Sequence, residues 1–270
     1  MKRVPVVAGR FYPGKKQNLE QELGSFCSNN TEKKKAWGCI MPHAGYLYSG
    51  KTAGEVISRI KITDTVIILG PNHTGQGSAF SIYPEGEWET PLGGVEVDRN
   101  VVSLLQKGSN LLEEDYSAHQ FEHSIEVEIP FLQYFRRDIK IVPICLGGGT
   151  LEDWKRLGEE IARVVQENSL DILVIASSDM SHYEPLAVAK RKDKIALDAI
   201  VNLDAESLIE NIRQYNISMC GYIPVTVLLS FAKMQGAKTA KIVDYTTSGE
   251  VSGDAESVVG YAGVVIYKEG

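Results

Sequence analysis

The stretch Asp64-Thr65-Val66-Ile67-Ile68-Leu69-Gly70-Pro71-Asn72-His73 decides the fold class of this 270-residue chain. From Asp64 to Leu69 it is a continuous apolar run rich in β-branched residues, which is typical of a strand buried on both faces of a parallel sheet. Gly70 and Pro71 favour a tight turn, and His73 follows. The stretch therefore predicts a buried strand that delivers a histidine at its carboxyl end.

Strands of this kind alternate with amphipathic helices along the chain. Further strands are predicted at 37–41, 140–146, 171–176, 239–246 and 258–267, and helices at 14–30, 49–59, 98–107, 122–135, 151–167, 186–201, 204–214 and 222–235. The alternation predicts an α/β fold with a mostly parallel sheet and helices on both faces. Because the last two strands are consecutive, one edge of the sheet is expected to be mixed. No linker divides the chain, so we interpret residues 1–270 as a single domain.

Local signals refine these boundaries. Ser49 and Asp98 are predicted N-caps of the helices that follow them. The section around Trp88 is rich in glycine and proline and is expected to form loops. Pro130 is expected to kink the helix over 122–135 or to start a second turn there.

Composition excludes several classes of protein. A net charge of -7 argues against a nucleic-acid surface, because phosphate binding needs clustered Lys and Arg. No apolar stretch approaches the ~20 residues that span a bilayer, and the first residues lack the apolar core of a signal peptide. We therefore expect a cytoplasmic protein. The four cysteines are far apart and form no Cys-x-x-Cys pair, which argues against a zinc ribbon or a disulfide framework: Cys27, Cys39, Cys145 and Cys220.

Histidines follow two of the predicted strands. His43 comes after the strand at 37–41 and precedes small residues that leave it accessible, and His73 comes after the strand that begins at Asp64. Ligands of open α/β sheets bind at the carboxyl ends of strands, and adjacent strands lie about 4.8 Å apart. We expect these two strands to be adjacent and parallel, so that both side chains lie close together. Since histidine is the commonest metal ligand, this pair is a candidate metal site; the alternative is that each histidine is hydrogen-bonded within its own loop.

A third strand, over 171–176, ends in Ser177-Ser178-Asp179-Met180-Ser181-His182. Asp179 has the chemistry to ligate a metal or to orient a histidine by accepting its second N–H. The alternative role for Asp179 is the N-cap of a short helix, which does not account for His182.

His119 and His123 are four residues apart, so a helix would place them on one face. The pair lacks the Glu of a His-Glu-x-x-His motif, and His119 is expected at the surface. His123 is the better candidate, because Ser124, Glu126 and Glu128 near it are able to form a polar network.

Cys220 precedes Pro224, which fits the first turn of a helix. A helix N-terminus lowers the pKa of a thiol, so among the four cysteines Cys220 is the one suited to be a metal ligand or nucleophile. The alternative is a small buried apolar residue, which is the role expected for Cys39 and Cys145 in their strands.

Together, seven blocks that span the chain resemble the Memo family. They are Ala8-Gly9-Arg10-Phe11-Tyr12-Pro13, Pro42-His43-Ala44-Gly45-Tyr46, Leu69-Gly70-Pro71-Asn72-His73, Glu122-His123-Ser124-Ile125-Glu126, Ser177-Ser178-Asp179-Met180-Ser181-His182, Cys220-Gly221-Tyr222-Ile223-Pro224 and Gly260-Tyr261-Ala262-Gly263. The sequence is similar to the archaeal and bacterial branch of that family.

The resemblance implies a fold similar to class III extradiol dioxygenases, the non-haem iron enzymes that open catechol rings. It implies His43, His73 and Cys220 as metal ligands, with Asp179 and His182 completing the pocket and His123 facing it. Cys220 then takes the place of the carboxylate ligand of the dioxygenases. Thiolate and imidazole together favour iron, copper or zinc over magnesium or calcium, so iron or copper is the expected cofactor, with zinc as an alternative.

Three hypotheses of function follow. In the first, the chain is a metal-dependent oxidoreductase of small molecules, with His123, Asp179 and His182 as catalytic residues that tune ligands or move protons. In the second, the same pocket binds a peptide or small ligand without turnover, and tyrosines line it: Tyr46, Tyr48, Tyr183 and Tyr222. In the third, which has the weakest support, a Cys220 thiolate hydrolyses a substrate with a histidine as base.

Overall fold

A computed structural model of the chain describes residues 1–28 and 30–268. Its strands are β1 (Lys2–Arg3), β2 (Ala36–Met41), β3 (Thr65–Pro71), β4 (Phe80–Ile82), β5 (Glu87–Thr90), β6 (Gly93–Val97), β7 (Glu113–Glu114), β8 (Lys140–Leu146), β9 (Ile172–Ser177), β10 (His182–Glu184), β11 (Lys241–Thr247) and β12 (Val258–Tyr267). Its helices are α1 (Lys16–Phe26), α2 (Tyr46–Ile57), α3 (Arg99–Gly108), α4 (Ser117–Gln120), the 3-10 turn η1 (Glu126–Glu128), α5 (Ile129–Phe135), α6 (Leu151–Glu167), α7 (Leu186–Val201), α8 (Ala205–Tyr215), α9 (Tyr222–Met234) and α10 (Gly249–Ser252).

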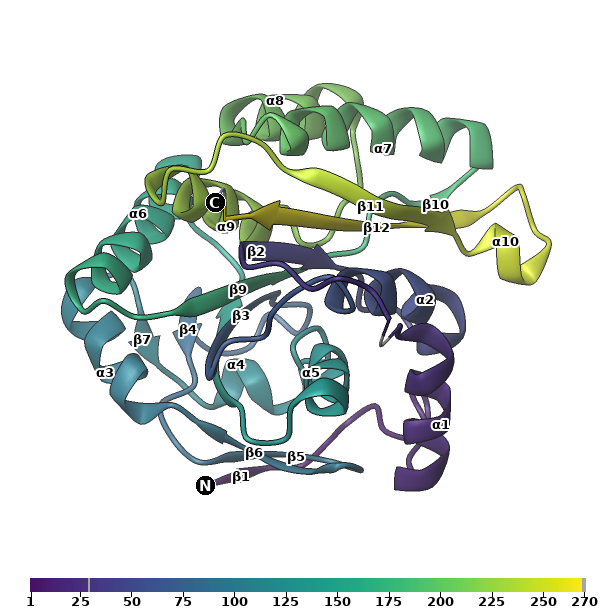
Figure 1. Ribbon diagram of the computed structural model, residues 1–270. Coiled ribbons are helices and arrows are strands. Elements are labelled where there is room, and N and C mark those ends of the chain that lie inside the picture. The colour runs from purple at the N-terminus through teal and green to yellow at the C-terminus, as the bar shows by residue number, and fades with distance from the viewer. Residues whose placement is uncertain (29, 269–270) are drawn as a thin grey trace.

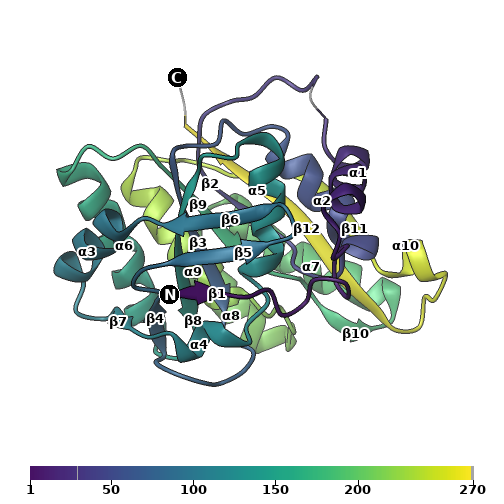
Figure 2. The same cartoon turned by 90° about the horizontal axis from the view of Figure 1, so that it is seen from below.

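The described strands join in one mixed sheet, whose main order is β1-β5-β6-β8-β3-β9-β2-β12-β10 (Figure 1). Strands β8, β3, β9 and β2 are parallel neighbours, and every residue of β3 and β9 is buried. Strand β12 runs antiparallel to both β2 and β11, which confirms the expected mixed edge. Figure 2 shows the far end of the sheet, where β1 lies beside β5.

Helices cover both faces of the sheet, as the alternation of elements predicts (Figure 1). Helix α9 packs against β2, β3 and β9 and against its neighbour α6, whereas α2 packs against β2, β11 and β12, next to α1 and α5. Close packing at β2 requires glycine at position 38, because a Cβ there would lie 2.4 Å from the backbone carbonyl oxygen of Val174 in β9. The α/β fold class is therefore confirmed.

The parallel strands bring their carboxyl ends to one edge of the sheet. Met41 of β2 is in register with Ser177 of β9, and Leu69 of β3 is in register with Ala176 of β9. The loops that follow these three strands therefore meet, and they carry the candidate residues. The expectation that β2 and β3 are direct neighbours is wrong, however, because β9 lies between them.

Several local predictions differ from the structure. Helix α2 begins at Tyr46, and the Ser49 hydroxyl donates to the Ala44 carbonyl from within that helix instead of capping it. The section expected to be loops contains β4 and the β5–β6 hairpin. Asp98 does cap α3, since its side chain accepts a hydrogen bond from the N–H of Val101. Pro130 lies at the start of α5, so the helix predicted from 122 begins only at the 3-10 turn.

None of the helices in the described part of the chain has both the length and the apolar character needed to cross a bilayer.

Candidate metal centre

His43 follows Pro42 in the short loop that connects β2 to α2, and its side chain is buried. Its backbone N–H donates to Oδ1 of Asp179 at 2.9 Å. Its ring has a partner on each side: Nδ1 lies 2.8 Å from Oγ of Ser177, and Nε2 lies 3.4 Å from Sγ of Cys220. The loop after β2 is therefore held against the end of β9, and the orientation of the ring is set from both sides.

The buried carboxylate of Glu122 holds His73 after β3. Nδ1 of His73 lies 2.9 Å from Oε1 of Glu122, and the backbone N–H of His73 donates to Oε2 at 2.6 Å. Oε1 also accepts from the N–H groups of His123 and Ser124, each at 2.9 Å. A carboxylate that binds one ring nitrogen leaves the other free, which is how metal-binding histidines are usually oriented.

His123 lies beside His73 under the same carboxylate. The two rings stack with centroids 4.8 Å apart and 22° between their planes, and Phe11 packs edge-on against His123 at 5.1 Å. Nδ1 of His123 lies 3.4 Å from Oε1 of Glu122. Since Glu122 faces Nδ1 in both rings, Nε2 lies on the far side of each ring.

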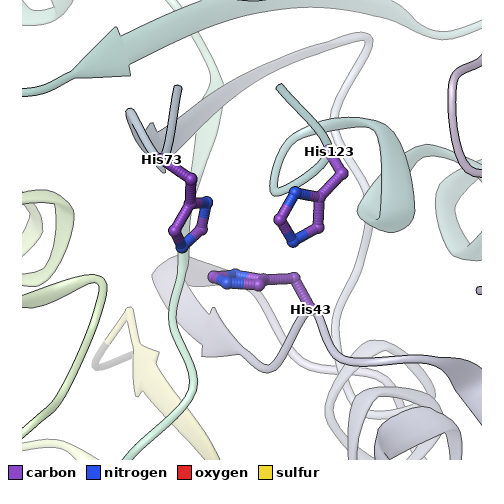
Figure 3. A group of neighbouring side chains, drawn as sticks. All are labelled: His43, His73 and His123. Carbon is purple, nitrogen blue, oxygen red and sulfur yellow. The ribbon is translucent and has the colours of Figure 1, made fainter. Parts of the chain in front are cut away.

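His43, His73 and His123 form one histidine triad. One nitrogen from each ring lies within 4.8 Å of the others, and Figure 3 shows the three rings converging from separate segments of the chain. Imidazole ligands suit zinc, copper, iron and nickel. The donor set and its orientation by Glu122 and Ser177 therefore fit a transition-metal ion.

The charges around the triad also suit a metal. Burial lowers the pKa of His43 well below its usual range, and the neighbouring histidines lower it further, so this ring is neutral and free to bind a cation. Burial also lowers the pKa of His123. For His73, burial lowers the pKa, but the hydrogen bond and charge of Glu122 outweigh burial and raise it. Burial alone would raise the pKa of Glu122; its hydrogen bond with His73 and its other partners instead lower it to about 2.

Cys220 lies beside the triad and is not part of the group that the distances define. Its sulfur accepts a hydrogen bond from the N–H of Asp179 at 3.3 Å and contacts Nε2 of His43. The sequence predicts His43, His73 and Cys220 as ligands; the structure brings the first two together with His123 and leaves the sulfur adjacent to His43.

The expected thiolate character of Cys220 is wrong for the metal-free chain. Pro224 lies in the first turn of α9, as predicted. Desolvation of the Cys220 sulfur nevertheless raises the pKa of the thiol, and the charge of Asp179 raises it further. The penalty for burying an anion therefore exceeds the effect of the helix N-terminus, and the third hypothesis, hydrolysis by a thiolate, loses its basis.

Asp179 and His182 lie at the same edge of the sheet. Asp179 accepts the His43 N–H and caps no helix. His182 begins β10, and its Nδ1 lies 2.8 Å from the carbonyl oxygen of Ser218. Because a carbonyl only accepts, Nδ1 of His182 is the donor in this contact.

The second hypothesis places four tyrosines around a pocket, and in the structure these differ in burial and contacts. Tyr46 is a core residue: it is buried, and its hydroxyl donates to the carbonyl of Val127 at 2.8 Å. Tyr222 packs edge-on against Trp154 at 5.5 Å. Tyr48 and Tyr183 are exposed, and Tyr183 has a φ of 58°, which is rare for a bulky residue.

The prediction that His119 is a surface residue is wrong. It is fully buried, its Nε2 lies 2.9 Å from Oγ of Ser81, and its ring packs against Tyr83 and Trp88. Helix α4 ends at Gln120, so His119 and His123 do not share a helical face. His119 is part of the core beneath the loop that carries Glu122.

The burial of His119 predicts a loss of stability in acid. Burial and the charge of Arg3 lower the pKa of His119 from 6.5 to about 3, so the unfolded chain binds this proton at a higher pH than the folded chain. Between pH 7 and pH 4 this residue alone is expected to lower the free energy of unfolding by about 3 kcal/mol. Urea titrations at both pH values check this. In His119→Gln, the difference in the free energy of unfolding between pH 7 and pH 4 should be smaller by that amount. Equal pH dependence in the two proteins would argue against it.

Sequence reasoning missed two residues of the site. The position of Glu122 next to the candidate His123 could have indicated a role at the site. Its contact with His73, however, depends on the fold. Ser177 is the last residue of β9, and the sequence contains no sign that its hydroxyl binds His43.

The fold and the triad together define a class: an α/β protein with a candidate histidine metal centre at the carboxyl ends of its parallel strands. Comparisons with known proteins identify the family. A model of the Memo family, described as Memo-like protein, matches residues 3–265. A MEMO1 family protein of Methanosarcina barkeri is 42% identical over 267 residues, covering 98% of this chain and 99% of its own length.

This chain belongs to the Memo family. A second relative, a MEMO1 family protein of Aquifex aeolicus, is 44% identical over 265 residues, with 97% of this chain and 98% of its own length covered. Among solved structures, an uncharacterized protein of Escherichia coli K12 matches with a TM-score of 0.54 at 15% identity, over 85% of this chain and 98% of its own. At that identity the likeness supports the fold alone.

Proposed function

We propose that this protein binds one transition-metal ion on the Nε2 atoms of His43, His73 and His123 and uses the site as an oxidoreductase of small molecules. The triad carries this proposal, because ring nitrogens from three separate segments lie within 4.8 Å of one another. Glu122 and Ser177 hold Nδ1 of two of the rings, so Nε2 is the ring nitrogen left to bind the ion. A bound iron or copper ion would supply the electron transfer; zinc fits the same donors without it.

The neighbours of the triad have proposed roles of their own. Cys220 lies close enough to His43 to serve as a further ligand, since two ligands of one ion are typically ~3.5 Å apart. Binding would then displace the thiol proton, which makes metal affinity pH-dependent. Asp179 positions the His43 loop, and the free Nε2 of His182 holds or moves a proton near the site.

Metal titration of the purified chain tests the proposal. The metal-free protein is expected to bind one equivalent of Zn²⁺ or, without oxygen, Fe²⁺ in equilibrium dialysis. His43→Ala and His73→Ala should lose more affinity than the roughly 10- to 100-fold that loss of a supporting residue costs. The variants His123→Ala and Cys220→Ala form a matched pair that identifies the third ligand. His123→Ala should lose metal binding, whereas Cys220→Ala should lower the metal affinity less. Cys27→Ala, a thiol at the end of α1, serves as control.

Absence of binding, or binding unchanged in both His43→Ala and His73→Ala, would overturn the metal centre. The redox step is tested separately by oxygen uptake with catechols on the iron-loaded protein. Uptake no greater than that of free iron would overturn the oxidoreductase proposal and leave metal binding intact.

The exposed residues beside the site favour a second candidate, a ligand-binding module. Leu47, Tyr48 and Tyr183 are exposed, and Tyr48, Tyr183 and Asp179 all lie near enough to influence the pKa of Tyr261. An exposed apolar rim of this kind suits a peptide or small ligand. Ligand binding that persists after chelation of the metal would favour this function over the first.

A further inference from the structure

The Ser177 hydroxyl makes three contacts of equal length. Its Oγ lies 2.8 Å from Nδ1 of His43, 2.8 Å from the carbonyl oxygen of Ser124 and 2.8 Å from Oε1 of Glu128. A hydroxyl donates one hydrogen bond and accepts up to two, and a carbonyl oxygen only accepts. If all three contacts are hydrogen bonds, Ser177 donates to Ser124, and both His43 and Glu128 donate to Ser177.

The opposite side of the His43 ring agrees with this assignment. When Nδ1 carries the proton, Nε2 has a lone pair and needs a donor. The Cys220 sulfur lies 3.4 Å from Nε2, and a thiol S–H is able to donate a weak hydrogen bond. The thiol is therefore the donor that this tautomer requires.

The surroundings of Glu128 also require a proton on its carboxyl group. Its side chain is fully buried, and Oε2 has no hydrogen-bond partner. The titratable groups that face Glu128 are Asp179 beyond β9, Cys39 on β2, Tyr46 on α2 and, across Ser177, His43, and no Lys or Arg is among them. A buried carboxylate without a cation is costly, whereas a carboxylic acid leaves only one acceptor unpaired. Burial and the charge of Asp179 raise the pKa of Glu128 well above its usual range.

We propose that Glu128 is a neutral carboxylic acid at neutral pH, and that it donates to Ser177 and so holds His43 as the Nδ1–H tautomer with its Nε2 lone pair facing the triad. Glu128 is thus a positioning residue that acts through Ser177. This role of Glu128 rests on the proposed metal centre, because a metal ion binds the Nε2 lone pair that the Nδ1–H tautomer leaves available.

The Glu128→Gln variant tests the protonation state. Glutamine has the same shape, and its amide donates to Ser177 as the acid does. A group whose folded pKa is raised contributes stability below its unfolded pKa, and that contribution is lost as the pH rises. The Tm of Glu128→Gln minus that of the wild-type protein should therefore be near zero at pH 4 and increase to a clear gain at pH 8. Asp179, Cys39 and Tyr46 are present in both proteins, so the effects of their titration on Tm largely cancel in this difference.

Histidine-selective ¹⁵N NMR of the metal-free wild-type protein tests the tautomer without any substitution. We expect a protonated Nδ1 and an unprotonated Nε2 for His43, with the same pattern in Glu128→Gln and its loss in Ser177→Ala. A Tm difference that stays constant or falls with rising pH, or a His43 ring protonated at Nε2, would overturn the proposal. Both measurements use metal-free protein, so their failure is distinct from a failure to bind metal.

Discussion

The Glu122→Gln variant is expected to bind metal about 10- to 100-fold more weakly than the wild-type protein, the loss typical of a disrupted supporting carboxylate. One carboxylate group accepts from Nδ1 and the backbone N–H of His73 and from the N–H groups of His123 and Ser124. In the glutamine variant, an NH2 group would replace one carboxylate oxygen. At least one of these N–H groups would then face another donor and lose its hydrogen bond. The substitution would also remove the negative charge that raises the pKa of His73 and strengthens this ring as a ligand.

Equilibrium dialysis of Zn²⁺ at pH 7 measures this loss. Glu210→Gln, the same change at an exposed position of α8, is the matched control and should bind as the wild-type protein does. A thermal melt of each metal-free variant separates weakened binding from unfolding. Wild-type affinity in a folded Glu122→Gln variant would contradict the role assigned to Glu122.

The Arg3→Met variant is expected to lose about 3–5 kcal/mol of stability, the cost of removing one partner of a buried ion pair. The Arg3 guanidinium is buried, pairs with Glu126 and packs over the Trp88 ring at 4.3 Å. It also donates to the carbonyl oxygens of His119 and Glu122. The first strand of the chain thus holds the loop that presents His123.

Urea denaturation at pH 7 measures this effect. Lys2→Met is the control, because Lys2 forms exposed ion pairs with Glu87 and Glu89 and should change stability little. Glu126→Gln added to Arg3→Met should recover part of the loss, since it removes a buried negative charge that then has no cation. The recovery is partial because Glu126 also accepts from the N–H groups of Val6 and Val7 and from the Tyr12 hydroxyl. A loss as small in Arg3→Met as in Lys2→Met would show that the ion pair contributes little.

The central strands could be predicted because burial on both faces leaves a continuous apolar run. This holds for β3, β8 and β9, whose predicted and observed bounds nearly coincide. The hairpin of β5 and β6 could not be predicted in this way. Its turn lies between Thr90 and Gly93, and its two neighbouring glycines, Gly93 and Gly94, are typical of loops. Such short strands depend on pairing with partners that the local sequence does not reveal.

The candidate site could be predicted only in part, for similar reasons. His43 and His73 follow buried strands, so their position at one edge of the sheet is visible in the sequence. The order of strands is not, and neither β9 between β2 and β3 nor the shared carboxylate of Glu122 could be inferred. The burial of His119 was missed because the segment around it is polar and short, and it is the tertiary fold that covers it.

Anomalous X-ray diffraction from crystals of the zinc-loaded protein tests the central claim most directly. Data on both sides of the zinc absorption edge identify the ion. We predict one zinc peak about 2.0–2.1 Å from Nε2 of each of His43, His73 and His123. A zinc ion bound by His43 and Cys220 without His123, or no zinc at the triad, would contradict the account.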